Sequence, residues 1–288
     1  MSKDFQKLLT IGITAYNEGD YLLEAWNSVV NQEDHRWQAI MVLDGRADKK
    51  TESNFDKIYH NNLHKIKLKE NLGPYLTRTL AIEQSKTDWY CQLDGDDLLD
   101  KNYVNLVLEC INSNHHAEII YHNVKYIRGD NISIKKFDNY NYNQLPFFLN
   151  SHCPFNKKIF FELKGYSTKC KDAADRDFLI KCGLDNKRFV FIKNSILYTV
   201  RKRSNSVGAQ RSASPSTRFF IAKYFHKKYS IYFIENNYYG QFFKEHLIPM
   251  IYYRFKNQQY IKFITMMIVL CYESKFHILK PFYNWCKK

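Results

Sequence analysis

Residues 89–99 read W-Y-C-Q-L-D-G-D-D-L-L, so an apolar run leads directly into the carboxylates of Asp94, Asp96 and Asp97. The run has the length and composition of a buried strand. The three carboxylates repel one another, and a divalent cation shared with phosphate oxygens would balance them; hard oxygen ligands on a compact turn suit Mg²⁺ or Mn²⁺. The alternative is a solvated turn in which Asp100 caps the next helix. The segment predicts a buried strand that ends in a polar cluster.

The same unit of strand and helix recurs outward along the chain. Apolar residues have helical spacing over residues 22–30, after Pro74 and over residues 104–111. Strands that are apolar throughout and alternate with helices indicate an α/β fold, with a mainly parallel sheet flanked by helices on both faces. Further buried strands are predicted at residues 8–14, 38–43, 65–68 and 118–122.

Polar clusters follow three of the predicted strands. They are T-A-Y-N-E (14–18), D-G-R (44–46) and D-G-D-D (94–97). Ligands of such sheets bind beyond the carboxyl ends of the strands, so we expect these clusters to meet at one rim. The ring of Tyr16 could stack there on a nucleobase, with core packing as the alternative.

The remainder of the chain has a weaker pattern. Residues 127–148 are Asn- and Tyr-rich and are interpreted as loops and short strands. Helices are predicted at residues 157–163 and 175–182, a strand at 189–192, and helices over 216–288. His122 and His152 lack a partner at metal-ligand spacing, so we interpret them as ordinary surface or core histidines.

The net charge of +14 belongs to the last third of the chain. Of 43 Lys and Arg and 29 Asp and Glu, residues 201–288 hold 16 and 3, which leaves 27 and 26 for residues 1–200. Nucleic-acid binding would predict a basic catalytic region, so we expect no nucleic-acid partner. The aromatic and basic extension suits docking on an anionic membrane; a helical lid or a dimer surface is the equal alternative.

The cysteines and the N-terminus bear on the compartment. The seven cysteines form no C-x-x-C pair, and residues 1–7 are polar rather than signal-like. The longest apolar run, residues 263–272, is too short to span a bilayer. We therefore expect a cytoplasmic protein, which membrane docking would bring to the inner face of the cell membrane.

Several motifs occur in an order that resembles the inverting, nucleotide-sugar-dependent family 2 glycosyltransferases, over residues 8–207. Beyond the clusters above, they are N-L-G-P-Y-L-T-R-T (71–79), F-E-L-K-G-Y (161–166), A-A-D-R-D-F (173–178) and Y-T-V-R-K-R-S-N-S-V (198–207). The resemblance implies the Rossmann-like GT-A fold. It places a catalytic domain at 1–210, with a nucleotide-binding half at 1–122 and an acceptor half at 123–210, before an extension at 211–288.

The resemblance also implies the site residues and the chemistry. Asp175 corresponds to the catalytic base, with Asp177 as the alternative, and Asp96 and Asp97 correspond to ligands of Mn²⁺ or Mg²⁺. Implied contacts to the nucleotide sugar, a UDP-sugar, are Thr14, Tyr16, Glu18, Asp44, Arg78, Asp94, Arg201 and Arg203. A carboxylate base and a single in-line displacement suit inverting transfer, and cations such as Arg201 would neutralise the leaving diphosphate.

The sequence leaves other functions open. The family implies a hexosyl- or N-acetylhexosaminyl-transferase acting on a saccharide or lipid-linked saccharide, in surface polysaccharide or lipopolysaccharide synthesis. A nucleotidyltransferase-like enzyme on the same rim and nucleic-acid binding through the tail are the alternatives. Leu43, Ala174 and Arg203 depart from the family pattern, which keeps a catalytically inactive relative in view.

Overall fold

The computed structural model describes residues 8–138, 149, 151–170, 172–203, 206 and 214–235, and the positions 251, 253, 255, 257–261, 264 and 268. The chain divides into two compact units, residues 1–202 and 203–288, so the boundary precedes the predicted one at residue 210. The predicted tail beyond residue 235 lies outside the described residues except at the positions just given.

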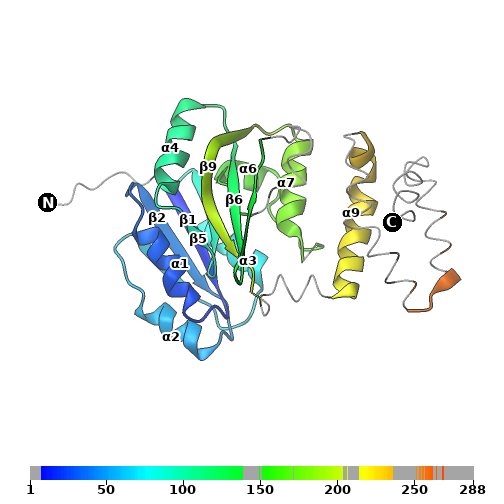
Figure 1. Ribbon diagram of the computed structural model, residues 1–288, viewed down its shortest axis with the longest axis horizontal. Helices are drawn as coiled ribbons and strands as arrows, with labels where there is room; N and C mark the ends of the chain where they lie inside the picture. Colours follow the sequence, from blue (N-terminus) through cyan, green and yellow to red (C-terminus); the bar gives the residue numbers. More distant parts are fainter. Residues whose placement is uncertain are drawn as a thin grey trace. The chain divides into compact units, whose positions relative to one another are not determined.

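The first half of the sheet is parallel (Figure 1). Its strand order is β3-β2-β1-β4, and all three pairings in it are parallel. The carboxyl ends of β1, β2 and β4 therefore lie at one edge, as the sequence predicts. The elements are β1 (Leu9–Ala15), α1 (Tyr21–Val30), β2 (Trp37–Leu43), α2 (Lys49–Lys57), β3 (Leu63–Lys67), α3 (Pro74–Gln84) and β4 (Trp89–Asp94).

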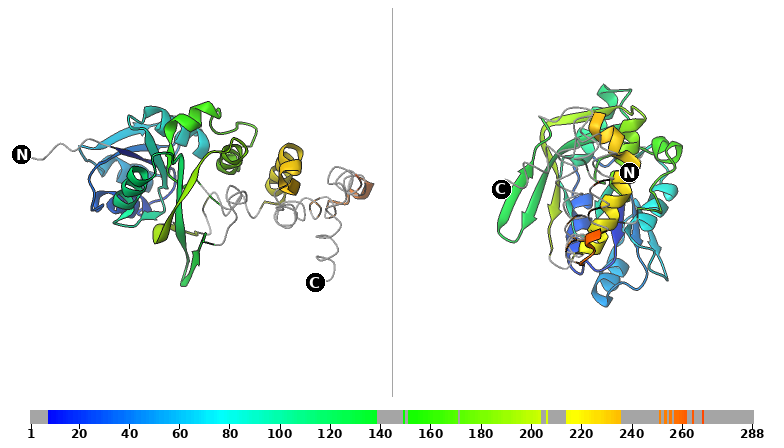
Figure 2. Two further views of the ribbon diagram at one scale, coloured as in Figure 1. Left: turned by 90° about the horizontal axis from the view of Figure 1, so that it is seen from above. Right: turned by 90° about the vertical axis from the view of Figure 1, so that its right-hand side faces the viewer.

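The second half of the sheet makes it mixed. β8 is antiparallel to both β4 and β6, whereas β6 and β9 are parallel to each other. The β6–β7 hairpin extends from this half (Figure 2). The elements are β5 (Leu98–Leu99), α4 (Tyr103–Ser113), β6 (Ile119–Arg128), β7 (Asn131–Lys135), β8 (Phe155–Asn156), α6 (Lys157–Glu162), α7 (Ala174–Leu184) and β9 (Phe189–Arg201).

The core lies where helices cover the parallel strands. β1 and β2 are buried at nearly every position, which requires cover on both faces, and helices lie on both sides of the sheet. Gly12 is necessary at the centre of β1, because the Tyr90 ring crosses it: a Cβ at residue 12 would lie 1.9 Å from the Tyr90 hydroxyl oxygen. Because these strands are buried, the polar segments that follow them are held in place at the rim.

The structure confirms the α/β fold and corrects details of it. β3 was expected to be a buried strand, but among the described strands it pairs only with β2, and its side chains are partly exposed, which is the character of an edge strand. β9 runs to Arg201, well past the predicted end at residue 192, because β6 and then β5 pair with its second half. This extension delivers Tyr198 and Arg201 to the acidic cluster.

The second unit contains one long helix among its described residues, α9 (Pro215–Glu235). Phe220 and Ile231 are exposed on it, while Phe225 and Phe233 are buried. A helix in the extension agrees with the prediction. In the part of the chain that the structure describes, no helix has both the length and the apolar character needed to cross a membrane.

Candidate active site

Asp44 holds the turn that begins α3. Its buried carboxylate accepts hydrogen bonds at Oδ1 from the backbone N–H groups of Gly45 (2.9 Å) and Leu72 (2.8 Å), and at Oδ2 from that of Gly73 (2.8 Å). Three charge-assisted bonds to backbone donors tie β2 to the start of α3. Asp44 therefore lies at the predicted rim, with backbone partners, and its contact with a nucleotide stays a prediction.

Arg78 and Asp94 form the central ion pair of the rim. One guanidinium nitrogen of Arg78 donates to both carboxylate oxygens of Asp94, at 2.6 and 2.8 Å. The Arg78 side chain is only 8% exposed, and that of Asp94 is 35% exposed. The pair thus joins α3 to the end of β4 and keeps the Asp94 carboxylate partly open to a ligand.

Gln92 connects this pair to the end of β1. Its side-chain amide donates to the Thr14 hydroxyl (3.1 Å) and reaches Asp94 Oδ1 at 3.4 Å, and its carbonyl oxygen accepts from the Tyr90 hydroxyl (2.7 Å). Thr14 and Asp94 are paired in register across β1 and β4. The predicted donor-binding residues Thr14, Arg78 and Asp94 are therefore one connected group.

The turn after β1 folds back on itself. Glu18 Oε2 accepts a hydrogen bond of 2.5 Å from the backbone N–H of Tyr16. Gly95 allows the β4 turn to approach this segment, because a Cβ there would lie 2.9 Å from the Thr14 carbonyl oxygen and 3.2 Å from Glu18 Cγ. Tyr16 is half-buried beside the acidic turn, and its stacking on a base stays a prediction.

Asp97 is buried and held by β9. Its Oδ2 accepts from the Tyr198 hydroxyl (3.0 Å) and its Oδ1 from the backbone N–H of Arg201 (2.8 Å). The Tyr198 oxygen also accepts from the backbone N–H of Asp94 (3.2 Å). Burial, with the nearby charges of Asp94 and Asp96, raises the pKa of Asp97 well above its ordinary value.

The guanidinium of Arg201 is engaged by protein groups. It contacts the backbone carbonyl of Asp96, pairs with the Glu24 carboxylate and lies 4.5 Å from the centre of the Tyr21 ring. Arg201 therefore lies beside the acidic turn and ties it to α1. Its predicted contact with a diphosphate stays a prediction, as does that of Arg203, which belongs to the second unit.

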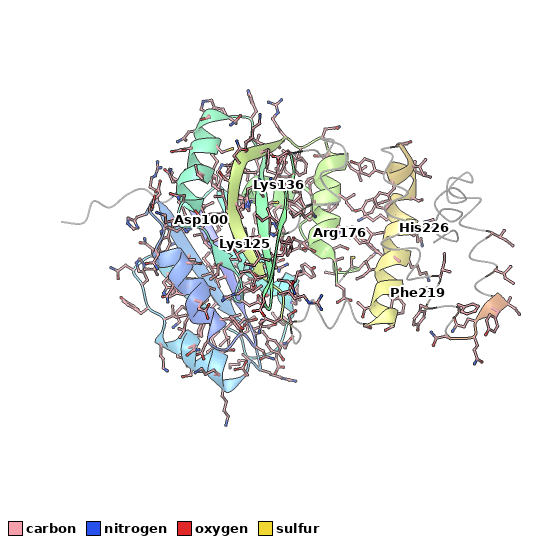
Figure 3. All side chains as sticks on the ribbon, in the orientation of Figure 1. Asp100, Lys125, Lys136, Arg176, Phe219 and His226 are labelled. Carbon is pink, nitrogen blue, oxygen red and sulfur yellow. The ribbon has the colours of Figure 1, made fainter. Side chains whose placement is uncertain are left out.

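The two candidate bases on α7 have different surroundings. Asp177 is fully buried and lies 3.8 Å from the Lys181 ammonium, which also donates to the backbone carbonyls of Leu163 and Gly165. Asp175 is partly exposed, and its Oδ1 accepts a 2.8 Å hydrogen bond from the Tyr75 hydroxyl of α3. Arg176, which is labelled in Figure 3, lies between the two aspartates in the first turn of α7. The geometry thus connects Asp175, not Asp177, to the rim.

The acidic turn is the place where a divalent cation would fit. Within the described ranges, no group of three or more His, Cys, Asp or Glu side chains is arranged to hold a metal ion by itself. A cation here would be shared between a carboxylate and oxygens of the ligand, which is how Mg²⁺ is commonly bound. Asp97 already accepts two hydrogen bonds, so the partly exposed Asp96 is the better-placed ligand.

Two histidines and most of the described cysteines of the first unit are buried. His152 is buried and stacks on Tyr198, with ring centroids 4.6 Å apart. Burial lowers the pKa of His122 to about 4 and that of His152 well below its ordinary value. The described cysteines, Cys91, Cys110, Cys153, Cys170 and Cys182, are free thiols. His122 and His152 are therefore core residues, one of the two alternatives left by the sequence.

Comparison with known proteins assigns the family. The family model described as Glycosyl transferase family 2 matches residues 10–174, which is more than half of the chain and includes the rim. The chain belongs to glycosyl transferase family 2. This membership favours the glycosyltransferase over the nucleotidyltransferase-like enzyme and the nucleic-acid-binding protein, and it agrees with the predicted enzyme class.

Relatives of this glycosyltransferase include archaeal and bacterial proteins. An uncharacterized glycosyltransferase of Methanocaldococcus jannaschii is 25% identical over 211 residues, which cover 69% of this chain and 72% of the relative. A teichoic acid poly(glycerol phosphate) polymerase of Staphylococcus epidermidis is 34% identical over 107 residues, which cover 36% of this chain and 15% of that protein. The second match concerns one portion of a much longer chain.

A solved structure shares the fold of this glycosyltransferase. TarS 1-349 of S. aureus, in complex with UDP-GlcNAc, matches with a TM-score of 0.64 at 18% identity, over 83% of this chain and 81% of TarS 1-349. The likeness shows the fold, which is GT-A. The prediction of a GT-A catalytic region is confirmed.

Sequence reasoning missed several residues that hold the site in place. Tyr75, Tyr198 and Gln92 contact Asp175, Asp97 and Asp94 respectively. Tyr75 lies three residues before Arg78, a spacing that puts both on one side of a helix, so the α3 pattern carried a signal for it. Tyr198 had no such signal, because its partners Asp94 and Asp97 lie 104 and 101 residues away in the sequence.

Proposed function

We propose that this chain transfers a sugar from a UDP-sugar to a hydroxyl group of a saccharide acceptor, with inversion at the anomeric carbon. The observation that carries the proposal is the connection of Asp175 through Tyr75 to α3, the helix that carries Arg78, which pairs with Asp94 at the end of β4. This contact brings a partly exposed carboxylate next to the nucleotide-type rim. A base beside the donor site can take the proton of an acceptor hydroxyl that attacks the anomeric carbon in line with the leaving group.

The donor end of the site is supported by the rim residues. Thr14, Asp94 and Arg78 form one hydrogen-bonded group at the carboxyl ends of β1 and β4, where α/β sheets bind nucleotides. TarS, which shares the fold, was solved with UDP-GlcNAc and also with UDP. We therefore take a UDP-sugar as the donor class, with Tyr16 stacked on the base.

The acceptor end requires a base, and Asp175 has the right surroundings for one. The acceptor oxygen attacks the anomeric carbon, its proton passes to Asp175, and the bond from that carbon to the diphosphate oxygen breaks with its electron pair going to UDP. Asp175 lies in the first turn of α7 and is partly exposed, so that an acceptor hydroxyl can approach its carboxylate. We favour Asp175 over Asp177 for this role, because Asp177 is completely buried beside Lys181.

The proposed cofactor is Mn²⁺ or Mg²⁺, held by Asp96 and, after rearrangement of its hydrogen bonds, by Asp97. A bound divalent cation would stabilise the negative charge of the leaving diphosphate. The crowding of Asp94, Asp96 and Asp97 supports the assignment, because three carboxylates on one turn favour a cation. Arg78 already neutralises Asp94 and leaves the other two to the cation.

The proposed setting is synthesis of a cell-surface polymer of the teichoic acid type or of a related surface polysaccharide. A relative of part of this chain is a teichoic acid polymerase, which supports the polymer class. The basic aromatic extension supports membrane docking near a lipid-linked acceptor, because it combines cations with exposed apolar side chains such as Phe220 and Ile231. Lipopolysaccharide synthesis is the other setting that the family permits.

One panel of proteins tests the donor, the metal and the base together. Calorimetry measures UDP binding with Mn²⁺ and again with EDTA, and release of UDP from UDP-GlcNAc measures turnover. We expect Asp96→Ala to lose the metal-dependent part of UDP binding. We expect Asp175→Asn to bind UDP normally and to lose turnover by about a thousandfold, since general base catalysis contributes about a hundredfold to ten-thousandfold.

The matched control is Asp185→Asn, which removes an exposed carboxylate from the other end of α7 and should keep both activities. Turnover retained in Asp175→Asn would move the base elsewhere. UDP binding that ignores EDTA and Asp96→Ala would reject the metal. An absence of UDP binding by the natural chain would reject the UDP-sugar donor.

A further inference from the structure

A tyrosine links the two halves of the proposed active site. The hydroxyl of Tyr75, in the first turn of α3, donates to Asp175 Oδ1 at 2.8 Å, across a separation of 100 residues in the chain. Tyr75 follows Pro74, and Gly73 before it is fixed by Asp44. The backbone that carries the tyrosine is therefore anchored to the end of β2.

The ring of Tyr75 is held between two neighbours. The Arg78 guanidinium lies 5.3 Å from its centre, and the ring of Tyr166 lies 5.4 Å away at an interplanar angle of 59°. Tyr166 in turn packs edge-on against Phe160 at 5.0 Å and against Phe178 of α7 at 5.9 Å. Such contacts restrict the ring, so its hydroxyl points in a set direction.

We propose that Tyr75 is a positioning residue, which orients Asp175 for proton abstraction and couples its position to the Arg78–Asp94 pair. The proposal rests on the transferase function proposed above. A hydrogen bond to one carboxylate oxygen fixes the rotation of the group, so the other oxygen is presented in a defined direction. Small displacements of a reacting group of about 1 Å can lower rates by about a hundredfold.

The pH dependence of the reaction would report on the groups around Asp175. The other titratable or charged groups near Asp175 come from α3, from the segment before α7 and from the first turn of α7. They are Arg78, Tyr166, Cys170, Arg176 and Asp177. Tyr75→Phe changes none of their charges.

The test is Tyr75→Phe in the full chain, with UDP release from UDP-GlcNAc as the assay. The ring stays, so packing against Arg78 and Tyr166 is kept, and only the hydroxyl is lost. We expect kcat to fall by about tenfold to a hundredfold, while KM and the Kd for UDP change by less than about twofold. The profile of kcat against pH should change as well, which a purely structural loss would not cause.

Control variants separate positioning from a general effect on structure. Tyr59→Phe removes an exposed tyrosine hydroxyl remote from these contacts and should leave kcat and the pH profile unchanged. In an Asp175→Asn background, Tyr75→Phe should lower the residual turnover no further, because the base it orients is gone.

Different outcomes reject different claims. A natural chain that binds UDP but releases none from any UDP-sugar overturns both the transferase function and the role of Tyr75. An active natural chain with unchanged kcat and pH profile in Tyr75→Phe overturns the positioning role alone. Weakened UDP binding or a lowered melting temperature with an unmoved pH profile means a structural tyrosine, and so does an additional loss in the Asp175→Asn background.

Discussion

Replacement of Arg78 by Met should destabilise the first unit through the carboxylate that it leaves behind. Met keeps the apolar part of the side chain and removes the charge, so Asp94 loses bonds of 2.6 and 2.8 Å. Loss of one partner from a buried pair costs about 3–5 kcal/mol. Because the Asp94 side chain is 35% exposed and water screens its charge, we expect about 2 kcal/mol.

The converse change should cost more. Asp94→Asn leaves the guanidinium of Arg78, which is 8% exposed, without its charged partner. We expect a loss of about 3 kcal/mol, since water reaches this charge less easily. The double variant should lose less than the sum of the two single variants by about 1–2 kcal/mol, which is the coupling of the pair.

Urea unfolding followed by tryptophan fluorescence measures these free energies. Three of the four tryptophans, Trp26, Trp37 and Trp89, lie in the first unit and report on its unfolding. Unchanged m-values would show that the variants alter stability and not the extent of unfolding. If the single losses add in the double variant within about 0.5 kcal/mol, the two residues do not act as a pair and the reasoning is refuted.

Two further predictions concern the interior. Gly12→Ala should lower the free energy of unfolding by about 3 kcal/mol, because the new Cβ would lie 1.9 Å from the Tyr90 hydroxyl, which must then move away from Gln92. A second change, Tyr90→Leu, should restore part of the loss. An unaltered urea midpoint in Gly12→Ala would contradict this contact. Burial lowers the pKa of His122 from 6.5 to about 4, so its contribution is fully present above pH 6.5 and is lost as the pH falls toward 4. His122→Leu should therefore reduce the loss of unfolding free energy between pH 6.5 and pH 4 by roughly 3 kcal/mol. Buried His152 should still contribute to the slope of that free energy against pH. Equal slopes in the natural protein and in the variant would refute the prediction.

The two candidate bases illustrate where sequence reasoning stops. Asp175 and Asp177 both lie in the first turn of one helix, so spacing and type do not distinguish them. The structure separates them because Asp177 is buried beside Lys181, whereas Asp175 meets Tyr75 from a helix 100 residues earlier in the chain. The two aspartates differ because of packing between elements that are far apart in the sequence, and a local sequence pattern does not reveal such packing.

By itself, the sequence determined the alternation of apolar strands and amphipathic helices, and therefore the α/β fold and the edge at which polar strand ends meet. Those features are local, since side-chain periodicity and turn residues act over a few positions. Only the tertiary structure decided that Arg78 pairs with Asp94, that Tyr198 and Arg201 reach Asp97, and that β3 is an edge strand. These contacts depend on strand order and register, which arise when residues far apart in the chain pack together.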